Sequence, residues 1–277
     1  MAKIEQFWLF HCGYAKIPKF LFEKGGGSRQ GKLPMMAALL VHDELGPVLI
    51  DAPFGPEGPS NTGELLGAIL RRTGVVFKPE WAIVPRIEQL GFRASEINHV
   101  LMTHLHFDHT GGMKSVAHAR FHIDRDEWMS ASGMKPLEAA RAGYVVGDFR
   151  ALAPRIEKMD LSQATIESGF DVFGDGTVEA VPLRGHSIGH TGFRCRVGDA
   201  EIFYVGDAVY AYSQIAKPRG FSPFAKSAAY DLNQASETAE GLRTWFGQHP
   251  DAVFANAHDF DLGESCMGGP RALHPSV

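Results

Sequence analysis

The segment "THLHFDHTGG", residues 103–112, constrains this chain more than any other part of its sequence. Within six residues it carries three histidines and one aspartate, at His104, His106, Asp108 and His109. The preceding "SEINHVLM" predicts a strand that runs into this cluster. Alternate side chains of an extended stretch share a face, so His104 and His106 can reach one metal ion. Asp108 and His109 follow where the chain turns and can reach a second ion.

Each of these histidines has an ordinary explanation when taken alone, as a surface residue or a hydrogen-bonded core residue. The group does not, because three imidazoles so close together would repel one another once protonated below their usual pKa of about 6.5. Imidazole and carboxylate without thiolate suit zinc, and also iron, manganese, cobalt or nickel. The cluster therefore predicts a metal centre but does not fix the metal.

The composition is that of a folded protein, and we expect its partner to be a small-molecule substrate rather than nucleic acid. Hydrophobic residues make up 44% and charged residues 21%, and the net charge of -5 offers no basic field for nucleic acid. Glu5 interrupts the apolar run at the start, unlike a signal peptide or a membrane span, so we expect no membrane span and a cytoplasmic location. The scattered Cys12, Cys195 and Cys266 are expected to be reduced thiols.

Strand and helix signals alternate along the rest of the chain. Residues 35–53 predict a β-hairpin, while 64–72 and 80–90 have helical spacing, weakened in the second case by Pro85. "RFHID", "TVEAVPLRG", "GFRCRV", "EIFYVGD" and "AVFANAHD" predict strands. "RDEWMSAS" and residues 231–246, with Asp231 as the cap, predict helices. We expect a single α/β domain, residues 1–277, in which two mixed β-sheets pack between helices.

The histidine segment resembles the HxHxDH signature of the metallo-β-lactamase superfamily. That family also has a histidine after a later strand, an aspartate after the next hairpin and a histidine near the C-terminus. The matching residues here are His186 in "LRGHSIGHTG", Asp207 in "FYVGDAVY" and His258 in "FANAHD". The resemblance extends from the N-terminal hairpin to His258. It implies the αββα sandwich of the metallo-β-lactamase fold.

The same resemblance implies a dinuclear centre of two divalent ions, zinc first among them. One ion would be bound by His104, His106 and His186, the other by Asp108, His109 and His258, with Asp207 bridging both. Asp51 matches a buried aspartate near the family's site, and His190 lies four residues after the matched His186. Both are expected to support ligands rather than bind metal. The other histidines carry no spacing signal and are expected to be structural or exposed: His11, His42, His99, His118, His122, His249 and His274.

The signature does not name the substrate, since relatives hydrolyse β-lactams, thioesters, lactones, phosphodiesters and sulfates. Differences between this sequence and individual subfamilies reduce the number of candidate substrates. The commonest β-lactamases have a cysteine where Asp207 stands, and a glyoxalase-II-like helical region does not fit in the fewer than twenty residues after His258. What remains resembles the quorum-quenching N-acyl-homoserine-lactone lactonases, which have a tyrosine at the position of Tyr210. That resemblance implies ring opening by a metal-bridging hydroxide, with Tyr210 polarising the carbonyl and Asp108 shuttling a proton.

Alternatives remain open at this point. Tyr210 can be a packing residue, and the chain can be a pyridoxolactonase-like, other ester or thioester, or phosphodiester hydrolase, or a non-catalytic metal-binding module. Segments 53–86 and 211–230 are expected to be insertions that line the pocket. Six aromatic residues are candidates for that pocket or for core packing: Phe22, Phe54, Trp81, Phe107, Phe221 and Phe224. A homodimer is compatible with the sequence, which fixes neither oligomeric state nor natural substrate.

Overall fold

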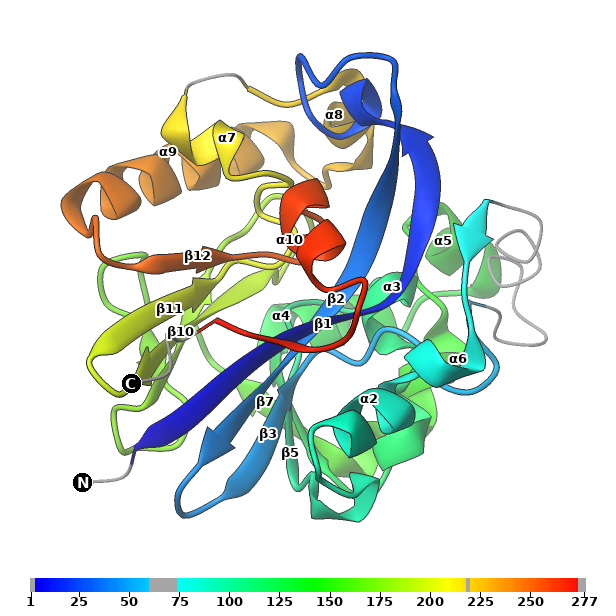
Figure 1. Ribbon diagram of the computed structural model, residues 1–277, viewed down its shortest axis with the longest axis vertical. Coiled ribbons are helices and arrows are strands. Elements are labelled where there is room, and N and C mark those ends of the chain that lie inside the picture. The colour runs from blue at the N-terminus through cyan, green and yellow to red at the C-terminus, as the bar shows by residue number, and fades with distance from the viewer. Residues whose placement is uncertain (1–2, 60–73, 218–219, 274–277) are drawn as a thin grey trace.

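Two long antiparallel strands form the centre of the fold in the computed structural model, which describes residues 3–59, 74–217 and 220–273 (Figure 1). Strand β1 (Ile4–Pro18) pairs with β2 (Gln30–His42) along its length, and β2 continues into β3 (Gly46–Ile50). The hairpin predicted for residues 35–53 is therefore confirmed. Strand β1 was not predicted, because register shifts at Ile4/Gln6 and His11/Gly13 disrupt the alternation that marks a strand.

The strands follow one hydrogen-bonded path in the order β12-β11-β10-β1-β2-β3-β5-β6-β7. Its β3 end contains β5 (His99–Leu101), β6 (Arg120–Asp124) and β7 (Ile156–Met159). Its other end contains β10 (Thr191–Val197), β11 (Ala200–Tyr204) and β12 (Val253–Ala255), with β9 (Val178–Pro182) paired to β10. Short strands β4 (Val75–Val76), β8 (Phe170–Asp171) and β13 (Arg271–Ala272) pair beside this path. Strand β1 joins the two halves, since it pairs with β10 at Ile4 and Val197.

Helices cover both outer faces of the curled sheet halves, which confirms the predicted αββα arrangement (Figure 1). On one side Trp245 of α9 (Leu232–Gln248) packs edge-on against Phe203 of β11, with ring centroids 5.1 Å apart. On the other side, Ile87 of α2 (Ile83–Gln89) belongs to the same apolar cluster as Phe121 of β6. A third cluster, including Phe7 and Phe193, lies between the halves. Burying each such side chain contributes about 1.5–3 kcal/mol.

Capping aspartates mark the two most clearly predicted helices. Asp231 accepts hydrogen bonds from the second and third amides of α9, and Asp124 does the same for α4 (Arg125–Ser132). The helix expected over 80–90 forms as η2 (Pro79–Trp81) and α2. Pro85 is tolerated because it lies in the first turn of α2, where amides lack an intrahelical partner. The helix expected over 64–72 lies outside the described residues.

Shorter helices complete the chain at the edges of the two sheet halves. The α-helices are α3 (Phe107–Thr110), α5 (Pro136–Arg141), α6 (Val146–Phe149), α7 (Ser213–Ala216), α8 (Pro223–Ala228) and α10 (Phe260–Ser265). The 3-10 helices are η1 (Lys19–Leu21), η3 (Ala94–Glu96), η4 (Met113–Val116) and η5 (Arg150–Arg155).

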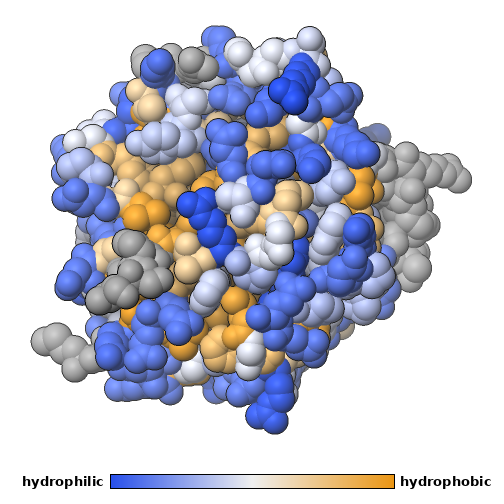
Figure 2. Space-filling view, viewed as in Figure 1, coloured by the Kyte–Doolittle hydropathy of each residue, from blue (hydrophilic) through white to orange (hydrophobic). Residues whose placement is uncertain are grey.

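Polar residues predominate on the face shown in Figure 2, where apolar residues appear as separate patches. Among the described residues, no helix has both the length and the apolar character needed to cross a membrane. The three cysteines are buried and unpaired, as the sequence predicted. The assignment of residues 1–277 to a single domain stays a prediction.

Candidate metal centre

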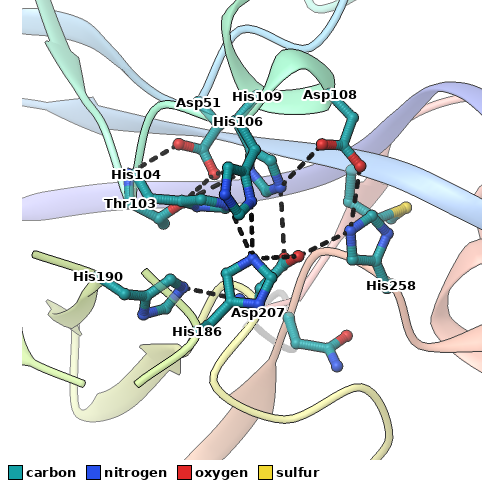
Figure 3. Close-up of polar contacts among 12 residues, drawn as sticks. Asp51, Thr103, His104, His106, Asp108, His109, His186, His190, Asp207 and His258 are labelled. Carbon is teal, nitrogen blue, oxygen red and sulfur yellow. Dashed lines mark hydrogen bonds and ion pairs between the residues drawn. The ribbon is translucent and has the colours of Figure 1, made fainter. Parts of the chain in front are cut away.

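The fold brings together the side chains of all seven candidate ligands, although they come from four separate loops (Figure 3). His104 and His106 follow β5, and the next turn, α3, carries Asp108 and His109. The other three follow β9, β11 and β12, at His186, Asp207 and His258. They meet because these strands end at one edge of the fold. The sequence predicted each strand separately but not this meeting.

The first group has the nitrogen spacing that a bound ion requires. His186 Nε2 lies 3.2 Å from His104 Nε2 and 2.9 Å from His106 Nδ1. Nitrogens that ligate a tetrahedral zinc ion at 2.0–2.1 Å stand about 3.3 Å apart. Three imidazoles therefore converge at nearly the separation that one zinc ion would impose.

The second group surrounds the carboxylate of Asp207. Its Oδ2 lies 3.0 Å from His258 Nε2 and 3.4 Å from His186 Nε2, while its Oδ1 lies 3.3 Å from His109 Nε2. Asp108 Oδ2 is 3.4 Å from His258 Nε2. Asp207 thus faces nitrogen atoms of both groups, as Figure 3 shows.

Two buried atoms at the centre have no hydrogen-bond partner among the described residues, namely His109 Nε2 and Asp207 Oδ1. Buried polar atoms in native proteins nearly always have a hydrogen-bond partner, so two neighbouring buried atoms without one suggest a missing ligand. A divalent cation fits this role, because imidazole and carboxylate are the groups that usually bind it. The residues present therefore fit the metal pair that the sequence implied.

Hydrogen bonds orient the histidine rings by occupying the nitrogen that points away from the centre. These contacts join His104 Nδ1 to Thr103 Oγ1 at 3.0 Å, His109 Nδ1 to Asp51 Oδ2 at 2.8 Å, His186 Nδ1 to Tyr210 Oη at 3.1 Å, and His258 Nδ1 to the Pro34 carbonyl at 2.6 Å. A proton held on the far nitrogen leaves the lone pair of Nε2 directed into the site.

Asp51 and His190 each form a hydrogen bond with one of the candidate ligands. Asp51 is buried, and its backbone adopts the left-handed conformation at φ 60°. Its carboxylate accepts hydrogen bonds from the Thr103 amide and hydroxyl at 2.8 and 2.9 Å. The Asp51 carboxylate therefore orients the ring of His109 and is itself fixed by hydrogen bonds from Thr103. His190 Nε2 accepts the amide hydrogen of Asp207 at 2.9 Å and so anchors that residue's backbone.

Burial controls the charge of the first group. It lowers the pKa of His106 to about 4, and it lowers the pKa of His104 and of His186 well below the ordinary value. These rings are therefore neutral near pH 7, as metal ligands must be. Burial alone would lower the pKa of His109, but the carboxylates of Asp207 and Asp51 outweigh it and raise that pKa well above its ordinary value. The negative field that favours a proton there also favours a cation.

A cavity of about 740 Å³ opens onto the centre. Three of the six candidate aromatics line it, namely Phe22, Phe107 and Phe224. Phe54 and Phe221 pack in apolar core clusters, and Trp81 packs edge-on against His11. Of the two candidate pocket segments, 211–230 contributes Phe224 and residues 227–230, and the described part of 53–86 contributes residues 74 and 75.

Several residues around the centre were not found from the sequence, among them Thr103, Glu127 and Tyr144. Glu127 did leave a signal, because it shares a helical face with the buried Trp128 and Ala131 at a position where an apolar residue is expected. Thr103 and Tyr144 left none, since their contacts join segments far apart in the sequence.

The αββα fold, with candidate histidine and aspartate ligands gathered at one edge, is that of a metal-dependent hydrolase. The chain matches the Metallo-beta-lactamase superfamily over residues 37–258 and belongs to that family. It is 29% identical over 236 residues to a probable metallo-hydrolase of Mycobacterium tuberculosis, covering 81% of this chain and 74% of that protein. It is 26% identical over 257 residues to an N-acyl homoserine lactonase of Agrobacterium fabrum, covering 92% and 93%.

Solved structures also share the fold. One is an N-acyl homoserine lactone hydrolase with the product N-hexanoyl-L-homoserine bound at its catalytic metal centre. It superposes with a TM-score of 0.72 at 19% identity and covers 95% of this chain and 97% of that one.

Proposed function

We propose that this chain is a dinuclear hydrolase that opens the ring of an N-acyl-homoserine lactone or a similar lactone. His104, His106 and His186 would hold one divalent ion, and Asp108, His109 and His258 the other, with Asp207 between them. When bound, such ions supply a water with a pKa lowered toward neutrality and a Lewis acid for a carbonyl oxygen. Zinc suits this donor set, as do iron, manganese, cobalt and nickel.

The observation that carries the proposal is the position of Tyr210, which lines the same cavity as the candidate ligands. Its hydroxyl lies 3.1 Å from His186 Nδ1. With Nε2 of His186 turned toward the ion, Nδ1 keeps its hydrogen and donates it to the phenol oxygen. The phenol's own hydrogen is then free to bond a substrate carbonyl in the cavity.

Tyr210 is suited to donate that hydrogen and not to act as a nucleophile. Burial and the carboxylates of Asp207 and Asp108 raise its pKa well above the ordinary value, so the phenol stays protonated at neutral pH. A fixed donor aimed at a carbonyl oxygen stabilises the negative charge that develops during attack. Asp108, whose side chain is 14% exposed at the cavity wall, can accept a proton from the attacking water and return it to the leaving alkoxide.

The cavity wall favours a neutral substrate with an apolar chain. The apolar residues of its lining include Ile17, Leu21, Phe22, Leu33 and Met35. The lining cations Lys16 and Arg141 are exposed, and no carboxylate lies within ion-pair distance of either among the described residues. A phosphodiester needs cations fixed beside its phosphate, whereas an acylated lactone needs apolar surface and one carbonyl donor. The named lactonases among the relatives support the same choice.

A substrate panel tests the proposal. The zinc-loaded protein is assayed with acyl-homoserine lactones, other lactones including pyridoxolactone, thioesters, phosphodiesters and β-lactams. We expect the highest kcat/KM with acyl-homoserine lactones. If the protein ignored lactones and cleaved a phosphodiester or a thioester instead, the lactonase assignment would fall and the metal-dependent hydrolase would stand.

Removing the hydroxyl with Tyr210→Phe should lower kcat for lactones by about 100- to 1000-fold, the usual effect of losing an aligned oxyanion donor. The lower end is expected, because an ion would share the same carbonyl oxygen. Metal content and Tm should stay near wild type. The exposed Tyr212 provides the matched control, since Tyr212→Phe removes a phenol oxygen away from the cavity lining. Unchanged lactone hydrolysis by Tyr210→Phe would contradict the assigned role.

A further inference from the structure

A fully buried carboxylate, Glu127 of α4, accepts four hydrogen bonds. Its Oε1 receives the Leu105 amide and the Tyr144 hydroxyl, both at 3.0 Å. Its Oε2 receives the Ser187 hydroxyl at 2.7 Å and the Gly189 amide at 3.0 Å. Both oxygens are thus fully engaged with groups that can only donate, or that do donate here.

The two backbone donors belong to the two segments that carry the first group of candidate ligands. Leu105 lies between two of the three histidines of that group, and Gly189 lies three residues after the third, His186. One carboxylate therefore connects two loops whose histidines are 80 and 82 residues apart in the chain. Ring nitrogen atoms of these two loops converge at the candidate metal centre.

The second loop is also packed tightly against the start of α4. A Cβ added at Gly189 would overlap Asp124 Oδ1 and lie 2.5 Å from the Glu127 amide nitrogen. Arg184, at the start of the same loop, reaches Asp124 Oδ2 at 3.2 Å and donates to the Ile188 carbonyl. The loop is therefore packed against the N-terminal end of α4, where it contacts Glu127.

We infer that Glu127 is a positioning residue that sets the separation of the two histidine loops and thereby the nitrogen spacing of the first ion site. This inference rests on the proposed metal centre, since a spacing of imidazoles matters only if an ion is bound. Partners that orient metal ligands typically change metal affinity or activity by about 10- to 100-fold when they are removed.

An amide cannot replace this carboxylate. The hydroxyls of Tyr144 and Ser187 can rotate to accept, but the amides of Leu105 and Gly189 can only donate. Glutamine has one oxygen, so in either orientation its NH₂ group would face one of these backbone amides. Glu127→Gln keeps the volume of the side chain and forces one loop away from it, which makes it the most direct variant.

The test measures zinc affinity by competition with a chromophoric chelator and the visible spectrum of the Co²⁺-substituted protein. We expect Glu127→Gln to bind the more weakly held equivalent of zinc about 10- to 100-fold less tightly than wild type and to change the Co²⁺ spectrum. Glu88→Gln, at an exposed position of α2, removes the same charge far from the loops and should match wild type. A purely structural role would lower Tm without altering the Co²⁺ spectrum.

Each outcome decides between distinct claims. Wild type without metal affinity would overturn the proposed function itself. Wild type that binds zinc, together with Glu127→Gln of equal affinity and unchanged spectrum, would overturn only the role of Glu127. If Glu127→Gln does not fold, Ser187→Ala decides, because it removes one of the four hydrogen bonds and leaves the carboxylate in place. Weaker zinc binding by that variant supports the inference, and unchanged binding contradicts it.

Discussion

Asp207→Ala should abolish measurable lactone hydrolysis and leave the protein with less bound metal than any other single ligand variant. Asp207 faces nitrogen atoms of both histidine groups, so its loss affects both ions, whereas Asp108→Ala and His258→Ala each affect one. We expect its cost to exceed the roughly 100-fold that follows loss of a hydrogen-bond partner of a ligand. The measurement is kcat/KM together with elemental analysis of the three variants purified in parallel.

Asp251→Ala is the control, because Asp251 is an exposed aspartate beyond the end of α9 and should behave as wild type. Circular dichroism establishes that each variant is folded. Asp207→Ala with wild-type metal content and turnover would show that this carboxylate does not bridge two ions.

Stripping the metal with a chelator should remove all lactone hydrolysis and lower Tm, and added zinc should restore both. Activity falls because the ions supply the activated water and the Lewis acid of the proposed reaction. Stability falls because a ligand present at 1000 times its Kd stabilises the native state by about 4 kcal/mol, which corresponds to a shift on the order of 10 °C for a chain of this length.

A mock dialysis without chelator provides the control for handling losses. The other divalent ions, manganese and cobalt, are then added to separate samples of the stripped protein. Full activity in a stripped sample whose metal content is below detection would exclude a metal-dependent mechanism.

The candidate ligands could be picked out from the sequence because short motifs carry them, and their role as ligands stays a prediction. Alternation placed His104 and His106 on one face of an extended stretch, and the resemblance supplied the later histidines and Asp207. The hairpin formed by β2 and β3 and the capped helix α9 were predictable for a related reason, since their signals are local.

The contacts that orient the ligands were not predictable, because they depend on how distant segments pack. The carboxylate of Asp51 reaches Thr103, 52 residues away, and Glu127 reaches Ser187, 60 residues away. Strand β1 was missed for a different reason: bulges interrupt its alternation, and its central residues are buried on both faces. Among the candidate pocket aromatics, residue type alone could not separate Phe22, which lines the cavity, from Phe54, which lies in the core.

The most direct test of the dinuclear centre is the metal content of the protein after mild purification. Six candidate ligands in two groups of three, with Asp207 between them, predict about two transition-metal ions per chain by elemental analysis. Zinc titration of the stripped protein should restore activity in step with the same two equivalents. Protein that contains no metal and gains no activity when zinc, manganese or cobalt is added would contradict the dinuclear centre.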